Sequence, residues 1–151
     1  MSAMGCSELL FDTNAVLDFC CPTSERVRHD SVAKVVTQAF IDDVDAFVPI
    51  QSLNDAYYIL RRMGRTHEEG LRAIKGVISV FLPVGLLEEH ALAALESGEP
   101  DFEDGLIRAQ AESLGVDAIV TADRAAFAKS AVPHMTAEEC LLTFWPDEVG
   151  S

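Results

Sequence analysis

Short apolar runs alternate with longer helix-like stretches along most of this chain. Runs typical of strands lie at residues 8–12, 45–49, 77–83 and 117–123, with a weaker one at 132–135. Strands that alternate with helices form a mainly parallel sheet with helices on both faces. The sequence therefore predicts an α/β protein with three layers, α/β/α, around a central, mainly parallel sheet of about five strands.

Apolar spacing and capping residues predict where the helices lie. One apolar stripe has the i, i+3, i+4, i+7, i+8 spacing of a helix face and consists of Val32, Val35, Val36, Ala39 and Phe40. Further helices are expected at 52–63 with Ser52 as its cap, at 66–77 with Thr66 and Glu69 in capping-box spacing, at 86–97, and at 101–114. Gly64, Gly98 and Gly115 follow three of these segments as stop signals.

The length and the absence of repeats or linkers predict one domain over residues 1–151. Residues 1–6 are expected to lie outside the ordered fold. No apolar run approaches the roughly 18 residues that a membrane helix needs, and the N-terminal residues lack the pattern of a secretion signal. The four cysteines show no CxxC spacing, which is typical of free thiols in a reducing compartment. We therefore expect a soluble, cytoplasmic protein.

The net charge of −14 is the strongest feature of the composition. Such an excess of acids repels nucleic acid unless the charge is neutralised locally. It suits solubility, a basic protein partner, or carboxylates gathered around divalent cations. Five of the eleven basic residues lie in one stretch: Arg61, Arg62, Arg65, Arg72 and Lys75. This stretch is either a phosphate-contacting surface or an ordinary solvated helix face.

Four aspartates that are distant in sequence are predicted to meet at one edge of the sheet. Asp12 ends the first strand and Asp123 follows the fourth, so both lie at the carboxyl edge, where α/β proteins bind ligands. Asp104 begins the helix that leads into the fourth strand, and Asp55 lies early in the helix after the second strand. Both helices begin at the same edge. The sequence therefore predicts a cluster of carboxylates there.

Each acid also has a structural explanation. Asp101 is a plausible N-cap, Asp104 is favoured by the helix dipole, and Asp12 could belong to a turn. Asp55 is harder to explain, because Asp is a poor residue inside a helix. Packed carboxylates repel one another unless protons or cations relieve the charge. Oxygen ligands without His or Cys favour Mg²⁺ or Mn²⁺.

Three sequence blocks also resemble the PIN-domain nucleases, a family that includes VapC-like toxins of toxin–antitoxin pairs. The blocks are FDTN at 11–14, DFEDGLIRAQA at 101–111 and DAIVTADRAAF at 117–127, and the similarity extends from residue 9 to about residue 144. The resemblance implies a Rossmann-like PIN fold. It also implies an endoribonuclease that uses Mg²⁺ or Mn²⁺ to activate a water for in-line attack on an RNA phosphodiester.

The resemblance assigns the catalytic acids to Asp12, Asp55, Asp104 and Asp123. It implies that Asp12, Asp104 and Asp123 ligate the principal metal ion. Asp55 would complete the cluster or bind a second ion. The family commonly has Glu at this second position, and Asp55 is one methylene shorter, so a water would have to fill the gap or the second ion would bind weakly.

Four more residues receive supporting roles from the same resemblance. Asn14 and Thr121 are expected as polar groups beside the ligands, and Asp101 as an extra acid that binds the ion through water or only caps its helix. Arg124 could contact a substrate phosphate, although an ordinary surface arginine is the alternative. The resemblance implies an RNA substrate, a small antitoxin and a second copy of the chain as partners. The net charge of −14 predicts that the antitoxin is basic.

Two other functions remain compatible with the sequence. The first is a PIN-fold module that binds RNA or protein without useful catalysis, which Asp55 and the negative charge motivate. The second is a phosphoacceptor receiver domain, which also clusters acids at strand ends. A receiver needs its acceptor Asp at the end of a central strand and a Lys after a later one. Asp55 instead lies in a helical pattern, and no Lys follows Asp123 before Lys129.

Overall fold

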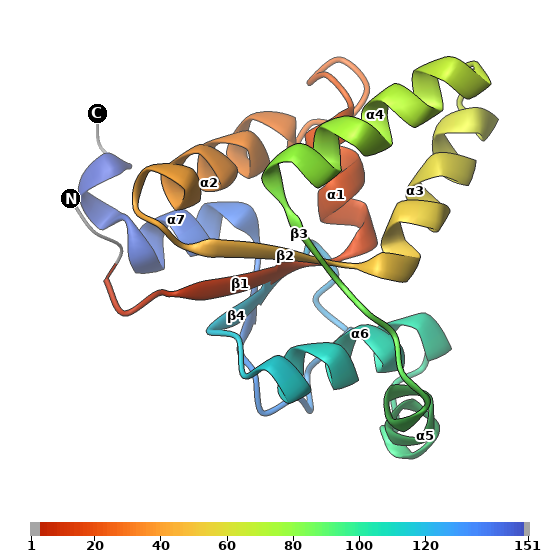
Figure 1. The fold of residues 1–151 in the computed structure, drawn as a ribbon. Helices are drawn as coiled ribbons and strands as arrows, with labels where there is room; N and C mark the ends of the chain where they lie inside the picture. The colour runs from red at the N-terminus through yellow and green to blue at the C-terminus, as the bar shows by residue number, and fades with distance from the viewer. Residues whose placement is uncertain (1–3, 150–151) are drawn as a thin grey trace.

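The computed structural model describes residues 4–149, in which strands and helices alternate along the chain (Figure 1). The strands form one sheet and are β1 (Glu8–Phe11), β2 (Asp45–Pro49), β3 (Leu82–Val84), β4 (Ala118–Val120) and β5 (His134–Met135). Every neighbouring pair is parallel, and the order is β3-β2-β1-β4-β5. The predicted parallel sheet is confirmed.

Helices cover both faces of this sheet (Figure 1). The α-helices are α1 (Thr13–Cys20), α2 (His29–Ile41), α3 (Ile50–Arg62), α4 (His67–Val80), α5 (Glu88–Glu96), α6 (Phe102–Leu114) and α7 (Ala137–Phe144); a short 3-10 helix, η1, spans Pro146–Glu148. Helices α5 and α6 lie on one side of the sheet, and α1, α2, α4 and α7 lie on the other. The three-layer α/β/α architecture is therefore also confirmed.

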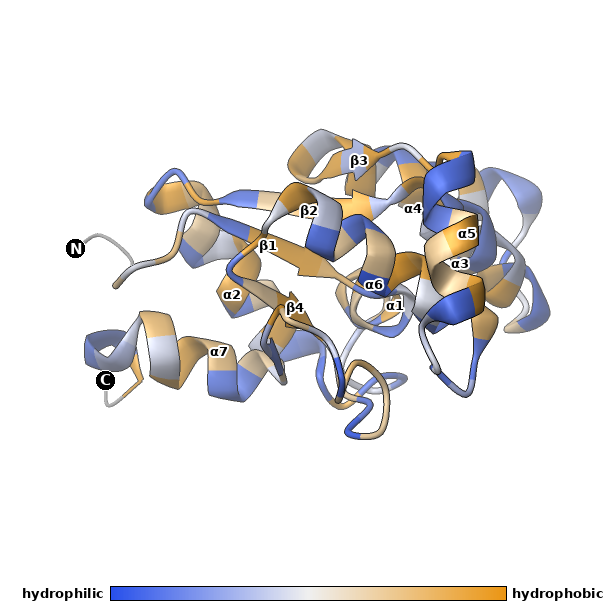
Figure 2. Cartoon of the chain, turned by 90° about the horizontal axis from the view of Figure 1, so that it is seen from below, coloured by the Kyte–Doolittle hydropathy of each residue, from blue (hydrophilic) through white to orange (hydrophobic). Residues whose placement is uncertain are grey.

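The alternation of side chains along β1 builds two cores. Leu9 and Phe11 pack into the cluster under α1, α2 and α7, whereas Leu10 packs on the other face with Ile107 of α6 and Ile119 of β4. All five side chains are essentially buried. Figure 2 shows the apolar strands at the centre of the molecule and the more polar helix surfaces around them. Burial on both faces accounts for the continuous apolar runs of the sequence.

The strand predicted at residues 77–83 is wrong in its first half. Helix α4 continues to Val80, and β3 begins only at Leu82. Val77 is buried on the inner face of α4, with Ala73 and Ile74 packed beside the same core. The β-branched residues therefore serve a helix here, because burial of the amphipathic face outweighs their modest strand preference.

Two local predictions also fail, and two helices were not predicted. Phe40 is 82% exposed, although the other four members of its stripe are buried. Ser52 does not cap α3, which begins at Ile50, and its side chain is buried instead.

The capping box of Thr66 and Glu69 is confirmed. Helices α1 and α7 lie in stretches for which no element was predicted, although Thr136 and Glu139 form a capping box that marks the start of α7.

The prediction that residues 1–6 stand apart from the fold does not hold at residues 4–6. The Met4 amide donates a hydrogen bond to the Phe144 carbonyl, and Cys6 is buried in the core. Residues 1–3 lie outside the described part of the chain. Within residues 4–149, no helix is both long and apolar enough to cross a bilayer.

The order of the strands creates a crevice beside β1. From β1 the chain moves to β2 and β3 on one side, and it then returns to β4 and β5 on the other. The connections leave the carboxyl ends of β1 and β4 in opposite directions, which opens a space between them. Asp12 directly follows β1, and Asp123 lies three residues after β4. The topology therefore places both acids at the edge of this crevice.

Candidate active site

A pocket of about 430 Å³ opens beyond the carboxyl ends of β1 and β4. Six carboxylates line it, and they belong to Asp12, Asp55, Asp101, Glu103, Asp104 and Asp123. The pocket contains all four predicted catalytic acids, together with Asn14. Thr121 and Arg124 are not among its lining residues.

Asp12 is the most deeply buried of these acids, with 5% of its surface exposed. One carboxylate oxygen accepts a hydrogen bond from the Ala15 amide and so caps α1, and the other accepts one of 2.6 Å from the Thr121 hydroxyl. Burial raises the pKa of Asp12 to about 6, although these two hydrogen bonds lower it. Asp12 is therefore held rigidly in a place that disfavours its charge.

Thr121 links the two acids that follow the central strands. Its hydroxyl donates to Asp12 and accepts a hydrogen bond of 3.0 Å from the Asp123 amide. Asp123 in turn accepts hydrogen bonds from the amides of Ala125 and Ala126, which close a tight turn after β4. Thr121 thus lies directly behind the pocket wall, where it orients Asp12 and the backbone of Asp123.

Helix α6 brings two further acids to the pocket from its first turn. Asp101 caps the helix by accepting hydrogen bonds from the amides of Glu103 and Asp104. Asp104 is half-buried, and burial raises its pKa to about 7, with further increases from Asp101, Asp123 and Asp12. Asp101 is therefore both an N-cap and part of the negative field that acts on Asp104.

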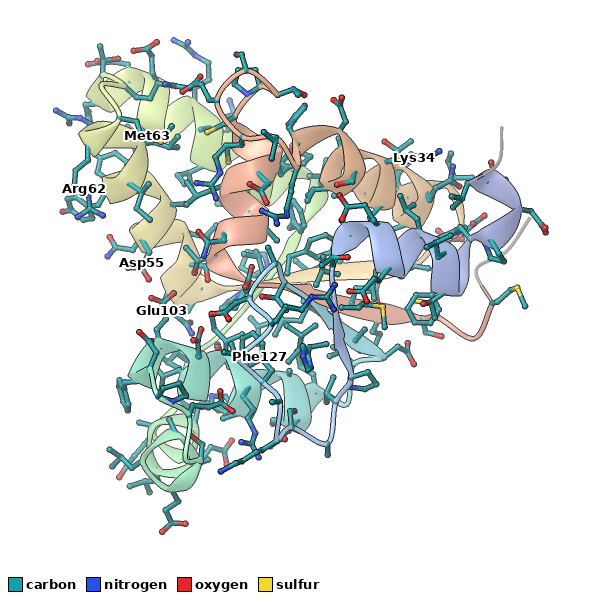
Figure 3. The ribbon with its side chains drawn as sticks, turned by 180° about the vertical axis from the view of Figure 1, so that it is seen from behind. Lys34, Asp55, Arg62, Met63, Glu103 and Phe127 are labelled. Atoms are coloured by element: carbon teal, nitrogen blue, oxygen red, sulfur yellow. The ribbon has the colours of Figure 1, made fainter. Side chains whose placement is uncertain are left out.

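Asp55 and Glu103 form a second pair of acids where α3 meets α6, as Figure 3 shows. The Thr13 hydroxyl donates a hydrogen bond of 2.6 Å to Glu103 and lies 2.7 Å from the hydroxyl of Ser52. Burial raises the pKa of Glu103, the Thr13 hydrogen bond lowers it, and the adjacent Asp55 and Asp101 raise it again. A chain of hydroxyls thus connects α1, α3 and α6 behind this pair.

Arg124 does not occupy the place expected of a phosphate-binding residue. It is an exposed side chain that forms an ion pair of 3.1 Å with Glu139 on α7. The arginine that does line the acidic pocket is Arg62, from the last turn of α3.

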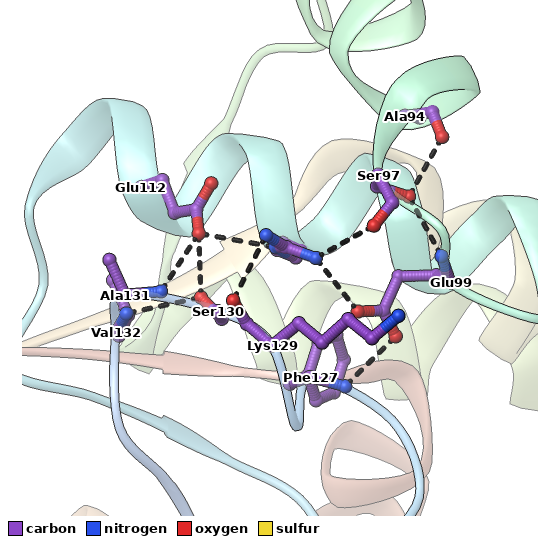
Figure 4. A network of polar contacts seen from close by, with 10 residues as sticks. Ala94, Ser97, Glu99, Glu112, Phe127, Lys129, Ser130, Ala131 and Val132 are labelled. Carbon is purple, nitrogen blue, oxygen red and sulfur yellow. Dashed lines mark hydrogen bonds and ion pairs between the residues drawn. The ribbon is translucent and has the colours of Figure 1, made fainter.

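A polar network behind the site joins the segment before α6 to the loop after β4 (Figure 4). Arg108 donates to the carboxylates of Glu99 and Glu112 and to the carbonyls of Ser97 and Lys129. The other oxygen of Glu99 accepts from the Phe127 amide. Because Asp101 and Asp104 follow the first segment and Asp123 begins the second, the network holds the backbones of both acidic segments together.

A family model described as a PIN domain matches residues 8–125, which is most of the chain. The chain belongs to the PIN-domain family. The match covers β1, β4 and all six carboxylates that line the pocket of this PIN domain. No curated protein matches the sequence significantly. Membership of the PIN-domain family excludes the receiver-domain alternative. The structure agrees, because Asp55 lies inside α3 rather than at the end of a strand.

Three solved structures share this fold. Mycobacterium tuberculosis VapC20, described as a sarcin–ricin loop cleaving toxin, is 14% identical, with a TM-score of 0.61 over 76% of this chain and 89% of that chain. PAE2754 from Pyrobaculum aerophilum is 23% identical, with a TM-score of 0.61 over 90% and 93%. A chain of FitAB bound to the IR36 DNA fragment is 16% identical, with a TM-score of 0.60 over 85% and 94%. At these identities the likeness concerns the PIN fold.

The donor atoms of the PIN-domain pocket suit a hard divalent cation. All six acids offer carboxylate oxygens, and neither His nor Cys lines the pocket. Mg²⁺ and Mn²⁺ prefer such oxygen ligands. Among residues 4–149, however, no three His, Cys, Asp or Glu side chains already stand close enough to hold one ion. The acids share one pocket without converging on a common point, as expected of like charges that repel one another.

Sequence reasoning did not place several residues in this pocket, among them Tyr58, Glu103 and Arg62, the last of which it named only as part of a basic stretch. Glu103 directly precedes the predicted Asp104, and only the packing of α6 against α3 shows that both side chains serve the pocket. Tyr58 and Arg62 follow Asp55 by three and seven residues, which places them on the same helix face. That spacing was a usable signal in the sequence.

The raised pKa values predict how the stability of the metal-free PIN domain depends on pH. Between pH 4 and pH 7 the folded protein retains protons on Asp12 and Asp104 that the unfolded chain releases. These two acids therefore make the free energy of unfolding fall as the pH rises through this range. Asp104→Asn should raise the Tm in EDTA at pH 7.5 by roughly 2–4 °C, which is about 1 kcal/mol after allowance for solvent screening.

This increase should shrink towards pH 4, where the wild-type carboxyl group is already protonated. Asp45→Asn is the matched control, because Asp45 is exposed at the start of β2, at the opposite edge of the sheet. Thermal denaturation of both variants across pH 4–8 tests the prediction. An Asp104→Asn variant less stable than the wild type at pH 7.5 would contradict it.

Proposed function

We propose that this PIN domain is an endoribonuclease that depends on Mg²⁺ or Mn²⁺ and acts as the toxin of a toxin–antitoxin pair. The observation that carries the proposal is the set of six carboxylates around one pocket, at the switch point of the sheet. Burial and mutual repulsion raise the pKa values of Asp12 and Asp104 there. Such a site disfavours its own charge unless a cation relieves it.

Asp12, Asp104 and Asp123 are proposed to hold the principal ion. When bound, an ion of this kind activates a water and stabilises negative charge on the phosphodiester and its leaving oxygen. The chain itself supplies the orientation. Thr121 fixes the Asp12 carboxylate by a hydrogen bond of 2.6 Å, and the turn after β4 fixes Asp123. No side-chain nucleophile is required.

Glu103 is proposed to compensate for the short side chain of Asp55. The two acids lie beside each other in the pocket, and Glu103 carries the additional methylene that Asp55 lacks. Thr13 holds one Glu103 oxygen by a hydrogen bond of 2.6 Å. A second ion, or a water bound to the first, would then find a carboxylate on each of α3 and α6.

The proposed partners follow from the charge and from the structural relatives. VapC20 is described as a toxin that cleaves the sarcin–ricin loop. The net charge of −14 and the acidic pocket favour an antitoxin with a basic segment that enters the pocket. A homodimer is expected from the family resemblance.

Cleavage assays with and without a divalent ion test the proposed activity. Single-stranded and structured RNA should be cut in Mn²⁺ or Mg²⁺ and should remain intact in EDTA. RNA that is bound but not cut in either ion would instead favour a binding module. Cleavage that persists in EDTA would contradict the metal-dependent mechanism.

Ion binding should also stabilise the fold. At a free Mn²⁺ concentration one hundred times its Kd, the free energy of unfolding should rise by about 2.7 kcal/mol, or roughly 5–10 °C in Tm for a domain of this size. Thermal denaturation with Mn²⁺ and with EDTA at pH 7.5 measures the shift. The Asp12→Asn variant should lose most of it, whereas an equal shift in the wild type and this variant would argue against the proposed ligands.

A further inference from the structure

An RNA strand that approaches this pocket meets strong repulsion from the acids, so its binding depends on nearby cations that are not already neutralised. Six of the eleven basic side chains are engaged by acids, by Tyr57 or by a backbone carbonyl. Among residues 4–149, the side chains without a hydrogen bond or ion pair are those of Arg28, Arg62, Arg72, Lys75 and Lys129. These five have no hydrogen bond or ion pair to give up when they contact a phosphate.

One of the five, Arg62, lines the acidic pocket itself. It is exposed on the last turn of α3, on the same side of the helix as Asp55 (Figure 3). Tyr58 also lines the pocket and lies four residues before Arg62, on the same helix face. Tyr58 is 57% exposed, and its ring is held edge-on against Tyr57 at 5.1 Å. An exposed aromatic ring beside a free arginine is the combination that proteins use to stack a base and to contact the adjoining phosphate of a single strand.

A second free cation lies in the neighbouring pocket, which has a volume of about 460 Å³. Arg28 is an exposed lining residue of this pocket, at the start of α2. Asn14 and Asp123 line both pockets, so the two pockets adjoin each other at the candidate active site. Arg26 also lines the second pocket, but its charge is already paired with Asp18 at 2.8 Å.

We infer that a single-stranded RNA crosses both pockets. Arg62 contacts a phosphate on one side of the acids, and Arg28 contacts another phosphate on the other side. Tyr58 stacks on an unpaired base. The inference rests on the proposed function and adds the path of the substrate. It replaces Arg124, which is paired with Glu139, by the two arginines that line the pockets and have no partner.

Equilibrium binding tests this path without RNA cleavage as a readout. The protein carries Asp104→Asn, so the proposed nuclease leaves a labelled 12-nucleotide single-stranded RNA intact, and fluorescence anisotropy is measured at several salt concentrations. Arg62→Gln and Arg28→Gln should each reduce the slope of log K against log salt by about 0.7, and the double variant by about 1.4. Tyr58→Leu should weaken binding by about fivefold or more without changing the slope.

Arg72→Gln is the matched control, because Arg72 is an exposed, unpaired arginine on α4 that lines neither pocket. It changes the net charge by the same amount and should leave the slope unaltered. A duplex of the same sequence should bind without any dependence on Tyr58, since its bases are already stacked.

The inference is overturned if the protein does not bind the RNA, or if either pocket arginine behaves like Arg72. If the wild type cleaves RNA but the arginine variants match the control, the path is wrong and the proposed activity remains. If binding depends on both arginines but the wild type cuts nothing in Mn²⁺ or Mg²⁺, the path is supported and the proposed activity fails.

Discussion

Asp12→Asn should lower the rate of RNA cleavage by about 100-fold or more. Substitution of a residue that only supports a metal ligand already lowers metal affinity or activity by about 10- to 100-fold. The substitution keeps the size of the side chain, and the amide oxygen can still accept the Ala15 hydrogen bond that caps α1. What it removes is the charge, which is the property that the proposed ion requires. Single-turnover cleavage of a labelled RNA in Mn²⁺ measures the loss.

Asp45→Asn again serves as the matched control, since it removes the same charge from an exposed position outside the pocket. Circular dichroism and the Tm in EDTA should show that the Asp12→Asn variant is folded. Activity within about threefold of the wild type in a folded Asp12→Asn variant would be incompatible with Asp12 as a ligand, because that loss is far below the expected effect.

Arg108→Met should produce the largest loss of stability. Arg108 is 16% exposed, and its partner Glu99 is 3% exposed, so the substitution would leave the Glu99 charge buried without its cation. Removal of one member of a buried pair costs about 3–5 kcal/mol, which is roughly 6–20 °C in Tm for a domain of this size. Thermal and urea denaturation measure this loss.

A second substitution tests the physical cause. Glu99→Gln in the Arg108→Met background should recover part of the stability, because the buried charge is gone and the amide oxygen can still accept from Phe127. Arg124→Met is the control for an exposed pair, at 71% and 42% exposure, and should cost less than about 1 kcal/mol. Equal losses for the Arg108→Met and Arg124→Met variants would refute the role assigned to this network.

The layers of the fold were predictable because they depend on local patterns. The apolar runs of β1, β2 and β4 have no competing interpretation, since each is short and bounded by turn residues or acids. Residues 77–80 did have a competing interpretation, because their β-branched side chains suit a strand and also fit the buried face of α4. Packing decided between the two, and a local pattern does not contain that information.

The candidate site divides in the same way. The positions of Asp12 and Asp123 were predictable, because the carboxyl ends of parallel strands share one edge of a sheet. The pairing of Asp55 with Glu103 was not, because it depends on how α3 approaches α6. Arg62 and Arg124 show the same limit, since only the neighbours of each arginine reveal which one retains a free charge.

By itself, the sequence determined the alternating elements, the parallel sheet and the edge at which the acids collect, because each follows from the periodicity of the chain and from strand direction. Only the tertiary structure decided which acids share a pocket, which hydroxyls hold them and which arginines remain unpaired. Those properties depend on distances between side chains from different elements. Burial and Coulomb repulsion depend on these distances, and the order of residues along the chain does not specify them.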